Sequence, residues 1–249
     1  MAVMDEFKEE RATLKDASLK KKLAYFWEYY KWYVIVPLLV LIFGGWAVYD
    51  IVTAKDVAFY SVMLNASEYV HATESKQEFA ELINLDTDKY EVMWDSSMHI
   101  QPSGADEISY TSAQKLFAYT AAAELDTMVA NATGFQKYAN SSTFYDMRDL
   151  LTEEQIAKYE PYFYYVDWKL VEEIEAANDA LDDSYVPVYT DPTKPEEMEQ
   201  PVPVGIFVSD CKKLTDNYYY REDDIVLGVY VNSTRPELAV TYLEYLFSE

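Results

Sequence analysis

Cysteine is almost absent from this sequence, since Cys211 is the only one in 249 residues. A single thiol excludes an intramolecular disulfide framework and a zinc site built from cysteines. Glycine and proline are also scarce, at six and nine residues, which excludes collagen-like and low-complexity chains. Only 20 basic residues stand against 44 acidic ones, giving a formal net charge of −24. Because nucleic-acid binding needs a basic face that neutralises phosphates, this charge argues against a nucleic-acid partner.

Recognisable catalytic and metal-binding patterns are missing as well. The two histidines, His71 and His99, have no His-x-x-x-His spacing, and no serine stands in a Gly-x-Ser-x-Gly elbow. The sequence has no glycine-rich phosphate loop and no twelve-residue calcium loop. We therefore predict a protein that is not an enzyme, with no cofactor and no metal site.

Apolar residues are plentiful, and one long run of them stands out. Residues 32–49, WYVIVPLLVLIFGGWAVY, carry no charge and are bounded by Lys31 and Asp50. A membrane-spanning helix needs roughly 20 mostly apolar residues, and aromatic residues at both ends are typical of its interfaces. The alternatives are a buried core helix and a cleaved signal peptide, but no Ala-x-Ala cleavage site follows Gly45. We predict a retained transmembrane helix over residues 32–52, in contact with the lipid bilayer.

The distribution of charge predicts the orientation of this helix. Five lysines precede it closely (Lys15, Lys20, Lys21, Lys22 and Lys31), whereas 13 basic and 38 acidic residues follow Tyr49. Positive charge is retained on the cytoplasmic side of membranes, so the positive-inside rule places the N-terminus in the cytoplasm. The expected organisation is a charged cytoplasmic helix over residues 1–31, the membrane span, and an extracytoplasmic domain over residues 53–249. This describes a single-pass protein of the cell membrane.

Beyond the span, segments with strand and helix patterns alternate. Buried or alternating apolar runs predict strands over residues 55–65, 90–96, 125–131, 162–168, 202–210 and 224–232. Helical spacing predicts helices over residues 75–85, 109–124, 134–140, 147–160, 169–181 and 235–247. Thr152 and Gln155 form a predicted capping box within the fourth of these helices. Alternating strands and helices predict an α/β domain with a mostly parallel sheet flanked by helices.

Two segments carry a resemblance to a known family. Residues 121–151, AAAELDTMVANATGFQKYANSSTFYDMRDLL, and residues 231–247, VNSTRPELAVTYLEYLF, resemble extracellular solute-binding proteins with the type II periplasmic-binding-protein fold. The membrane anchor with its Tyr/Trp collar looks like those of uncharacterised surface proteins of Gram-positive anaerobes. The resemblance covers roughly residues 55–249. It implies a ligand cleft and a transporter permease as partner.

The chain departs from this family in the region of the second lobe. Family members close two lobes on their ligand, but only residues 162–203 separate the first-lobe elements from the strand that returns to them. This segment is too short for a full lobe. We therefore expect a reduced or missing second lobe, and a cleft between the main lobe and residues 162–203.

Short polar residues follow several of the predicted strands. In open α/β sheets, ligands bind beyond the carboxyl ends of strands. Asparagine, serine and threonine there, including Asn232, offer directional hydrogen bonds to a sugar or a peptide, and Trp94, Tyr110 and Trp168 offer stacking faces. The alternative is that they cap the helices that follow. The predicted ligand-binding residues are Asn65, Ser67, Ser96, Ser97, Asn131, Thr133 and Trp168.

Two further patterns leave alternatives open. The tyrosine run at residues 218–220 is typical either of a binding surface or of loop packing. Asn65, Asn131, Asn140 and Asn232 all stand in N-x-Ser/Thr sequons, so a eukaryotic secretory origin remains an alternative. The sequence thus predicts a tethered protein that binds a sugar or peptide for a transporter. The alternative is a non-catalytic cell-surface interaction module that kept the fold and lost ligand binding.

Overall fold

The computed structural model describes residues 18–101, 106–182 and 184–248. The first 17 residues of the predicted cytoplasmic helix, including Lys15, therefore lie outside the described residues. The chain divides into two compact units, Met1–Ala54 and Lys55–Glu249. Each unit is considered by itself below.

The described part of the first unit is one long helix, α2 (Leu19–Thr53). Its stretch Lys31–Asp50 has a mean hydropathy of 1.9, and none of it is buried. At a rise of about 1.5 Å per residue, these residues match the roughly 30 Å hydrocarbon core of a bilayer. The chain therefore contains a helix that is long and apolar enough to cross a membrane.

The second unit contains a mixed six-stranded sheet. Its spatial order is β3-β1-β4-β8-β6-β5, and a separate ribbon pairs β2 with β7. The strands are β1 (Asp56–Leu64), β2 (Ser67–Glu68), β3 (Tyr90–Asp95), β4 (Thr127–Asn131), β5 (Phe163–Asp167), β6 (Pro201–Phe207), β7 (Tyr218–Tyr219) and β8 (Ile225–Val229).

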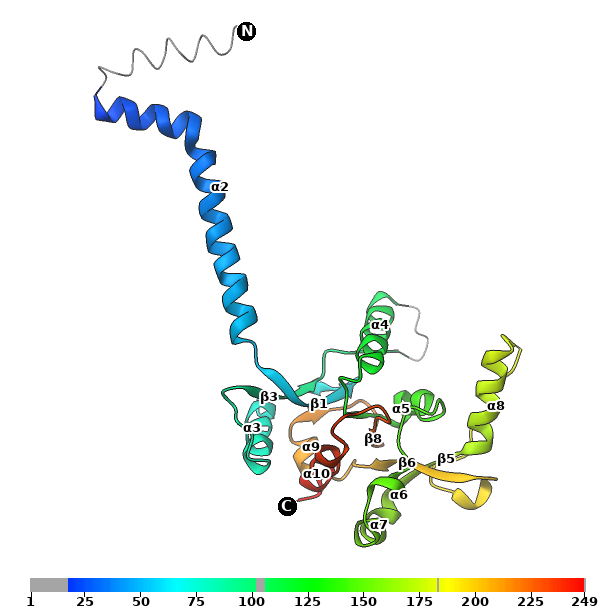
Figure 1. Ribbon diagram of the computed structural model, residues 1–249. Helices are drawn as coiled ribbons and strands as arrows, with labels where there is room; N and C mark the ends of the chain where they lie inside the picture. The colour runs from blue at the N-terminus through cyan, green and yellow to red at the C-terminus, as the bar shows by residue number, and fades with distance from the viewer. Residues whose placement is uncertain (1–17, 102–105, 183, 249) are drawn as a thin grey trace. The chain divides into compact units, whose positions relative to one another are not determined.

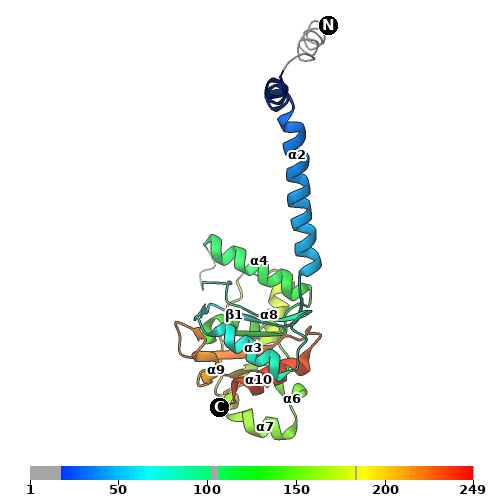
Figure 2. The ribbon, with the colours of Figure 1, turned by 90° about the vertical axis from the view of Figure 1, so that its left-hand side faces the viewer.

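Helices cover both faces of this sheet, so the unit is a three-layer α/β/α sandwich (Figures 1 and 2). One face carries α4 (Glu107–Ala121), α5 (Ala132–Ala139) and α8 (Trp168–Asp179). The other carries α3 (Ala72–Leu82), α6 (Met147–Leu150), α7 (Glu153–Tyr159), α9 (Lys212–Thr215) and α10 (Pro236–Leu246). Two short 3₁₀ turns, η1 (Glu160–Tyr162) and η2 (Pro195–Glu197), lie in the connections.

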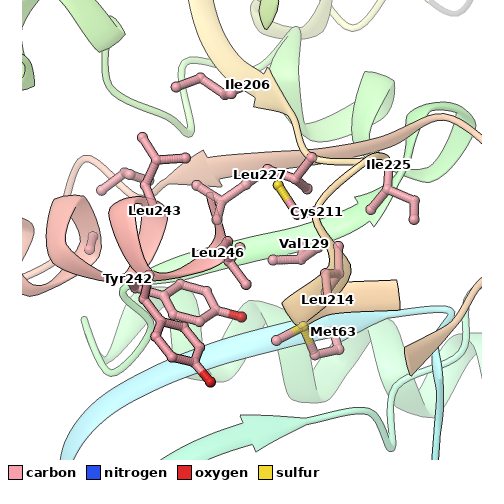
Figure 3. Close-up of a cluster of buried hydrophobic side chains, with 14 of the residues drawn as sticks. Met63, Val129, Ile206, Cys211, Leu214, Ile225, Leu227, Tyr242, Leu243 and Leu246 are labelled. Atoms are coloured by element: carbon pink, nitrogen blue, oxygen red, sulfur yellow. The ribbon is translucent and has the colours of Figure 1, made fainter. Parts of the chain in front are cut away.

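The alternation of side chains along each strand builds two hydrophobic clusters. In β1, Phe59 and Met63 pack under α3 and α10, whereas Tyr60, Val62 and Leu64 pack under α4 and α5. Figure 3 shows the first cluster, in which side chains of α10 meet residues from β1, β4, β6 and β8. Because both clusters lie wholly within residues 55–249, this unit carries its own hydrophobic core.

The expectation of a mostly parallel sheet is only partly met. β1 pairs in parallel with β3 and β4, but β8 is antiparallel to β4, β6 to β8, and β5 to β6. The loop from β6 to β8 holds no helix long enough to carry the chain across the sheet, so it returns the chain in the opposite direction. Residues 162–203 contribute β5 to the same sheet and do not form a second lobe.

The predicted helix over residues 147–160 is two helices. Leu151 has an extended backbone (φ −95°, ψ 145°) that ends α6. Thr152 then starts α7 with the predicted capping box: its hydroxyl accepts from the Gln155 N–H, and the Gln155 side chain accepts from the Thr152 N–H. The cap was thus predicted correctly, but the break that it creates was not.

Candidate ligand-binding site

The candidate site lies at one edge of the six-stranded sheet. The parallel strands β3, β1 and β4 all end there, followed by Ser96, Asn65 and Ala132. β6 also ends there, because it runs antiparallel to β8, which is itself antiparallel to β4. β8 begins at this edge, where Ile225 pairs with Asn131. The topology therefore gathers several strand ends and the residue 208–224 loop in one place.

Asn65 occupies a position that suits asparagine for a structural reason. Its backbone is left-handed (φ 63°), a conformation that asparagine adopts more easily than most other residues. Its Oδ1 accepts a 2.7 Å hydrogen bond from the Ile100 N–H, and its Nδ2 donates to Asn131 Oδ1 at 3.3 Å. Asn65 therefore fixes the turn after β1, and both polar groups of its side chain have protein partners.

Asn131, which contacts Asn65, lies with Thr133 against an acidic side chain of the 208–224 loop, Glu222. Contact with the Asn131 side chain, and with the hydroxyl and N–H of Thr133, outweighs burial and lowers the pKa of Glu222. Asn131 precedes α5, yet its side chain makes no helix-capping hydrogen bond. A Cβ at Gly134 would come within 2.8 Å of Asn131 Oδ1, so this arrangement requires a glycine there. The capping alternative does not hold for Asn131, because its side chain bonds across the edge.

A second polar group surrounds Asp95 at the end of β3. Its Oδ2 accepts from Lys115 Nζ at 2.8 Å and from the Tyr60 hydroxyl at 2.9 Å, and its Oδ1 accepts from the Ser97 N–H at 2.8 Å. Burial acts to raise the pKa of Asp95, but the hydrogen bonds from Lys115, Ser97 and Tyr60 outweigh it and lower this pKa to about 2. This carboxylate is therefore charged and held in place at neutral pH.

Beside these groups lies a partly open hollow of about 1310 Å³. Most of its lining comes from three segments: the loop from β6 to β8, the turn at Pro161 and Tyr162, and the residues Leu246, Phe247 and Ser248. Glu222 belongs to the lining and also contacts Asn131 and Thr133. Glu222 therefore links the hollow to two of the predicted strand-end residues.

The chemistry of the lining is aromatic and acidic. Tyr69, Tyr162 and Tyr219 line the hollow with 46%, 40% and 51% of their surfaces exposed. Its carboxylates are Asp210, Glu222, Asp223 and Asp224, against a single cationic side chain, Lys212. Such a lining offers flat apolar faces and hydrogen-bond acceptors, and its charge disfavours anionic ligands.

Cys211 also borders the hollow but is not a reactive thiol. Figure 3 shows its sulfur among the side chains of the first hydrophobic cluster, and only 5% of the residue is exposed. Burial, with a smaller contribution from Asp210, raises the pKa of the Cys211 thiol to about 12. Because the thiolate is the nucleophile, this environment keeps Cys211 inert.

The structure brings most of the predicted residues to this edge. Asn65, Asn131 and Thr133 cluster with Glu222, while Ser97 accepts from Lys115 at 2.9 Å and Ser96 lies 3.4 Å from a Glu68 oxygen. Ser67 lies in β2 opposite Tyr219. Within the described residues, no group of three or more histidine, cysteine, aspartate or glutamate side chains is placed to hold a metal ion. Contact of these residues with a ligand stays a prediction.

Trp168 and two other expected contributors lie elsewhere. Trp168 follows β5, which runs antiparallel to β4, so it stands at the opposite edge of the sheet. Asn232 follows β8 at that same opposite edge and donates to the carbonyl of Thr120. Trp94, a candidate stacking face, is 3% exposed and packs in the first cluster. The assumption of parallel strands caused the first two misplacements.

Most of the residues that line the hollow were not predicted from the sequence. Tyr162, Asp210, Glu222 and Asp223 were not predicted, and only one member of the tyrosine run, Tyr219, is exposed. Tyr218 and Tyr220 belong to the core instead. The usable signal was the 17-residue loop 208–224 between two strands, because antiparallel pairing of those strands places it at this edge.

Comparisons with known proteins leave the family open. No protein-family model and no curated protein matches the chain. Among solved structures, it is similar to the substrate-binding domain of a protein described as a molybdenum ABC transporter, from Clostridium difficile. That match has 14% sequence identity and a TM-score of 0.27, and it covers 78% of this chain and 93% of the other. Values this low establish neither a family nor a ligand for this chain.

Proposed function

We propose that residues 55–249 form a non-catalytic binding domain, held at the outer face of the cell membrane by α2, that takes a sugar or short peptide for a transporter permease. The hollow of about 1310 Å³ carries this proposal. It lies at the strand-end edge of an α/β sheet, which is the usual place for a ligand in such folds.

The lining supports an uncharged or cationic ligand. Tyrosine rings stack on the apolar faces of sugars and peptides, and carboxylates accept hydrogen bonds from hydroxyl and ammonium groups. Tyr162 and Tyr219 supply such rings, and Asp223 and Asp224 supply exposed carboxylates. An anion would meet four carboxylates and one lysine, so we do not propose an anionic ligand.

Two observations support a binding role without catalysis. The Cys211 thiol is buried, with its pKa raised to about 12, so it is protonated at neutral pH. The Asp95 carboxylate, whose pKa is about 2, is already bound by Lys115, Tyr60 and Ser97. Neither group is poised to exchange a proton near pH 7, as a general acid or base must be.

The proposed topology rests on charge and helix length. Lys20, Lys22 and Lys31 lie in α2 before or at the start of the apolar stretch, whereas 38 acidic residues follow Tyr49. A retained helix with a cytoplasmic N-terminus satisfies the positive-inside rule. It places the acidic domain and its hollow outside the cell.

The test is a thermal-unfolding screen of the full-length chain in detergent against sugars, oligosaccharides, amino acids and short peptides. A ligand at 100 times its dissociation constant stabilises the folded state by about 2.7 kcal/mol, which such a screen detects. We expect Tyr219→Ala and Asp223→Asn to weaken a hit at least tenfold, because both residues line the hollow.

Matched controls are available at the opposite edge of the sheet. Tyr90 begins β3 and Asp88 precedes it; both are exposed, so Tyr90→Ala and Asp88→Asn should leave the dissociation constant unchanged. A flat screen at millimolar ligand concentrations would contradict a solute-binding role. A hit that the two control variants weaken as much as the hollow variants would contradict the proposed location.

One observation favours the alternative interaction module. On α4, Tyr110 and Phe117 are seven residues apart and so share one helix face, and they are 62% and 76% exposed. Large exposed apolar residues that lie together are typical of protein interaction surfaces. If the solute screen is flat, this helix is the first place to look for a protein partner.

A further inference from the structure

The residues of α2 before its apolar stretch form a segment with a distinct composition. α2 has 35 residues and is about 52 Å long, whereas the hydrocarbon core of a bilayer is about 30 Å thick. Because Lys31–Asp50 fills that core, residues 19–30 extend beyond it. We call residues 19–30 the juxtamembrane segment. The juxtamembrane segment therefore lies outside the hydrocarbon core.

This segment is amphipathic. Leu19, Leu23, Phe26 and Trp27 follow the i, i+4, i+7, i+8 spacing that places side chains on one helix face. These four border a single shallow groove whose surface is almost entirely apolar, and they are 82%, 73%, 47% and 61% exposed within the described part of the chain. Such a face is costly to leave in water.

Lysines accompany this apolar face. At 100° per residue, Lys20 and Lys22 fall on opposite flanks of the line through Leu19 and Leu23, and both are exposed. Long lysine side chains in this position lay their methylene stems along the apolar face and raise their ammonium groups toward headgroup phosphates. Across residues 18–31, four lysines stand against one glutamate in a chain whose net charge is −24.

The shape of α2 fits this composition. Figures 1 and 2 show that its first turns run across the direction of the rest of the helix. Pro37 has no N–H for the carbonyl of Tyr33, which weakens the helix at the start of the apolar stretch. A helix that bends near Pro37 changes its direction close to Lys31, the first lysine on the N-terminal side of the apolar stretch.

We propose that the juxtamembrane segment lies in the membrane interface of the leaflet that α2 enters, with Leu19, Leu23, Phe26 and Trp27 in the acyl-chain boundary and Lys20 and Lys22 on anionic lipid headgroups. The occupant of the apolar face is the bilayer itself, because the same helix continues into it. A basic, aromatic, amphipathic helix is the type that binds anionic membrane surfaces. This inference rests on the membrane tether of the proposed function but not on its ligand.

The experiment is nitroxide accessibility in the full-length chain, reconstituted in phosphatidylcholine vesicles with and without 30% phosphatidylglycerol. Single labels are attached at Leu23→Cys and Glu28→Cys in a Cys211→Ala background, because position 28 lies about 140° around the helix from position 23 at 100° per residue. We expect the label at position 23 to collide more with oxygen and the label at position 28 more with a water-soluble nickel complex. The preference of the position 23 label for oxygen over nickel should be larger in the anionic vesicles. A Lys20→Gln, Lys22→Gln variant should not show this increase.

Each of the other possible outcomes contradicts one part of the proposal. Equal exposure of both labels to nickel means that the segment is free in water. Protection of the position 23 label from both reagents means that a protein surface covers it. Identical results in the two vesicle types mean that anionic lipid headgroups do not contribute to the binding of the segment. A label at Phe43→Cys reports the span separately: if it is exposed to nickel, the tether fails and this inference fails with it, whereas ligand binding by residues 55–249 is unaffected.

Discussion

At the residue scale, a buried ion pair joins the start of the sheet to the C-terminal helix. The Asp126 side chain is fully buried, and its Oδ1 accepts from Arg235 Nε at 3.0 Å and from the Ser233 hydroxyl at 2.6 Å. Its Oδ2 accepts from the Tyr60 N–H at 2.8 Å, and Arg235 also donates to the carbonyls of Val57 and Glu124. One guanidinium therefore connects the chain before α10 to β1 and to the residues before β4.

Removing the arginine should be strongly destabilising. Arg235→Met leaves the Asp126 carboxylate buried without its counter-charge, which typically costs about 3–5 kcal/mol. The measurement is urea unfolding of residues 55–249, which contain both hydrophobic clusters. Arg221→Met is the control, because Arg221 is exposed and its loss should change the free energy of unfolding by less than about 0.5 kcal/mol. Equal effects of the two substitutions would contradict this account.

Asp95 predicts a pH dependence of stability. Its pKa of about 2 in the folded protein is below the ordinary value of about 3.9 in an unfolded chain. The charged form is thus stabilised by folding: the contribution is complete above about pH 5 and is lost as the pH falls toward about 2. Asp95→Asn should therefore destabilise the domain at pH 7 and differ little from the unsubstituted chain at pH 2. If Asp95→Asn and the exposed control Asp88→Asn show the same pH profile, the Lys115 and Tyr60 contacts contribute nothing.

At the scale of elements, two glycines allow a helix to approach the sheet closely. A Cβ at Gly228 in β8 would come within 2.7 Å of the Phe135 ring, and one at Gly205 in β6 within 2.9 Å. Phe135 stacks on Phe144 at a centroid distance of 4.7 Å. The helix α5, which follows Asn131 and contains Thr133, therefore packs through this ring against strand backbone that carries no side chain.

Gly228→Ala should destabilise residues 55–249 by about 1–3 kcal/mol, because the added methyl group overpacks the core at Phe135. Thermal unfolding of the variant measures the loss. Phe135→Leu removes the ring, so in the double variant the alanine should cost measurably less than it does alone. Full additivity of the two substitutions would show that Phe135 is not the obstacle.

The sequence predicted the elements better than their pairing. Periodicity located all six strands of the main sheet, because each holds a run of apolar residues such as those of Phe59 to Leu64. It did not reveal the two-residue strands β2 and β7, which have no period to detect. The direction of β5, β6 and β8 was also missed, since apolar composition identifies a strand but not the neighbour with which it pairs.

The site was predictable only where it depends on strand ends. Asn65 follows β1 and Asn131 ends β4, and these two strands are parallel, so the two side chains meet at 3.3 Å at the same edge. Tyr162, Glu222 and Phe247 reach the same hollow from segments far apart in the sequence. Their proximity depends on antiparallel pairing and on the packing of α10, neither of which a local pattern contains.

At the scale of the whole molecule, the charge asymmetry predicts a sidedness that intact cells can report. With an epitope tag at the C-terminus, protease added outside should remove the tag, because residues 55–249 are proposed to be extracytoplasmic. A tag at the N-terminus should survive until the membrane is permeabilised. The reverse pattern, or protection of both tags, would contradict the proposed orientation.

Amide hydrogen exchange of the full-length chain, with and without the ligand that gives the largest thermal shift, tests whether the hollow is the binding site. We expect slower exchange concentrated in residues 208–224, which line the hollow, and in residues 131–134, which include the contacts of Glu222. Residues 168–181 at the opposite edge should exchange at the same rate in both states. Protection confined to α4 or α8, with none in the 208–224 loop, would show that the hollow is not the binding site.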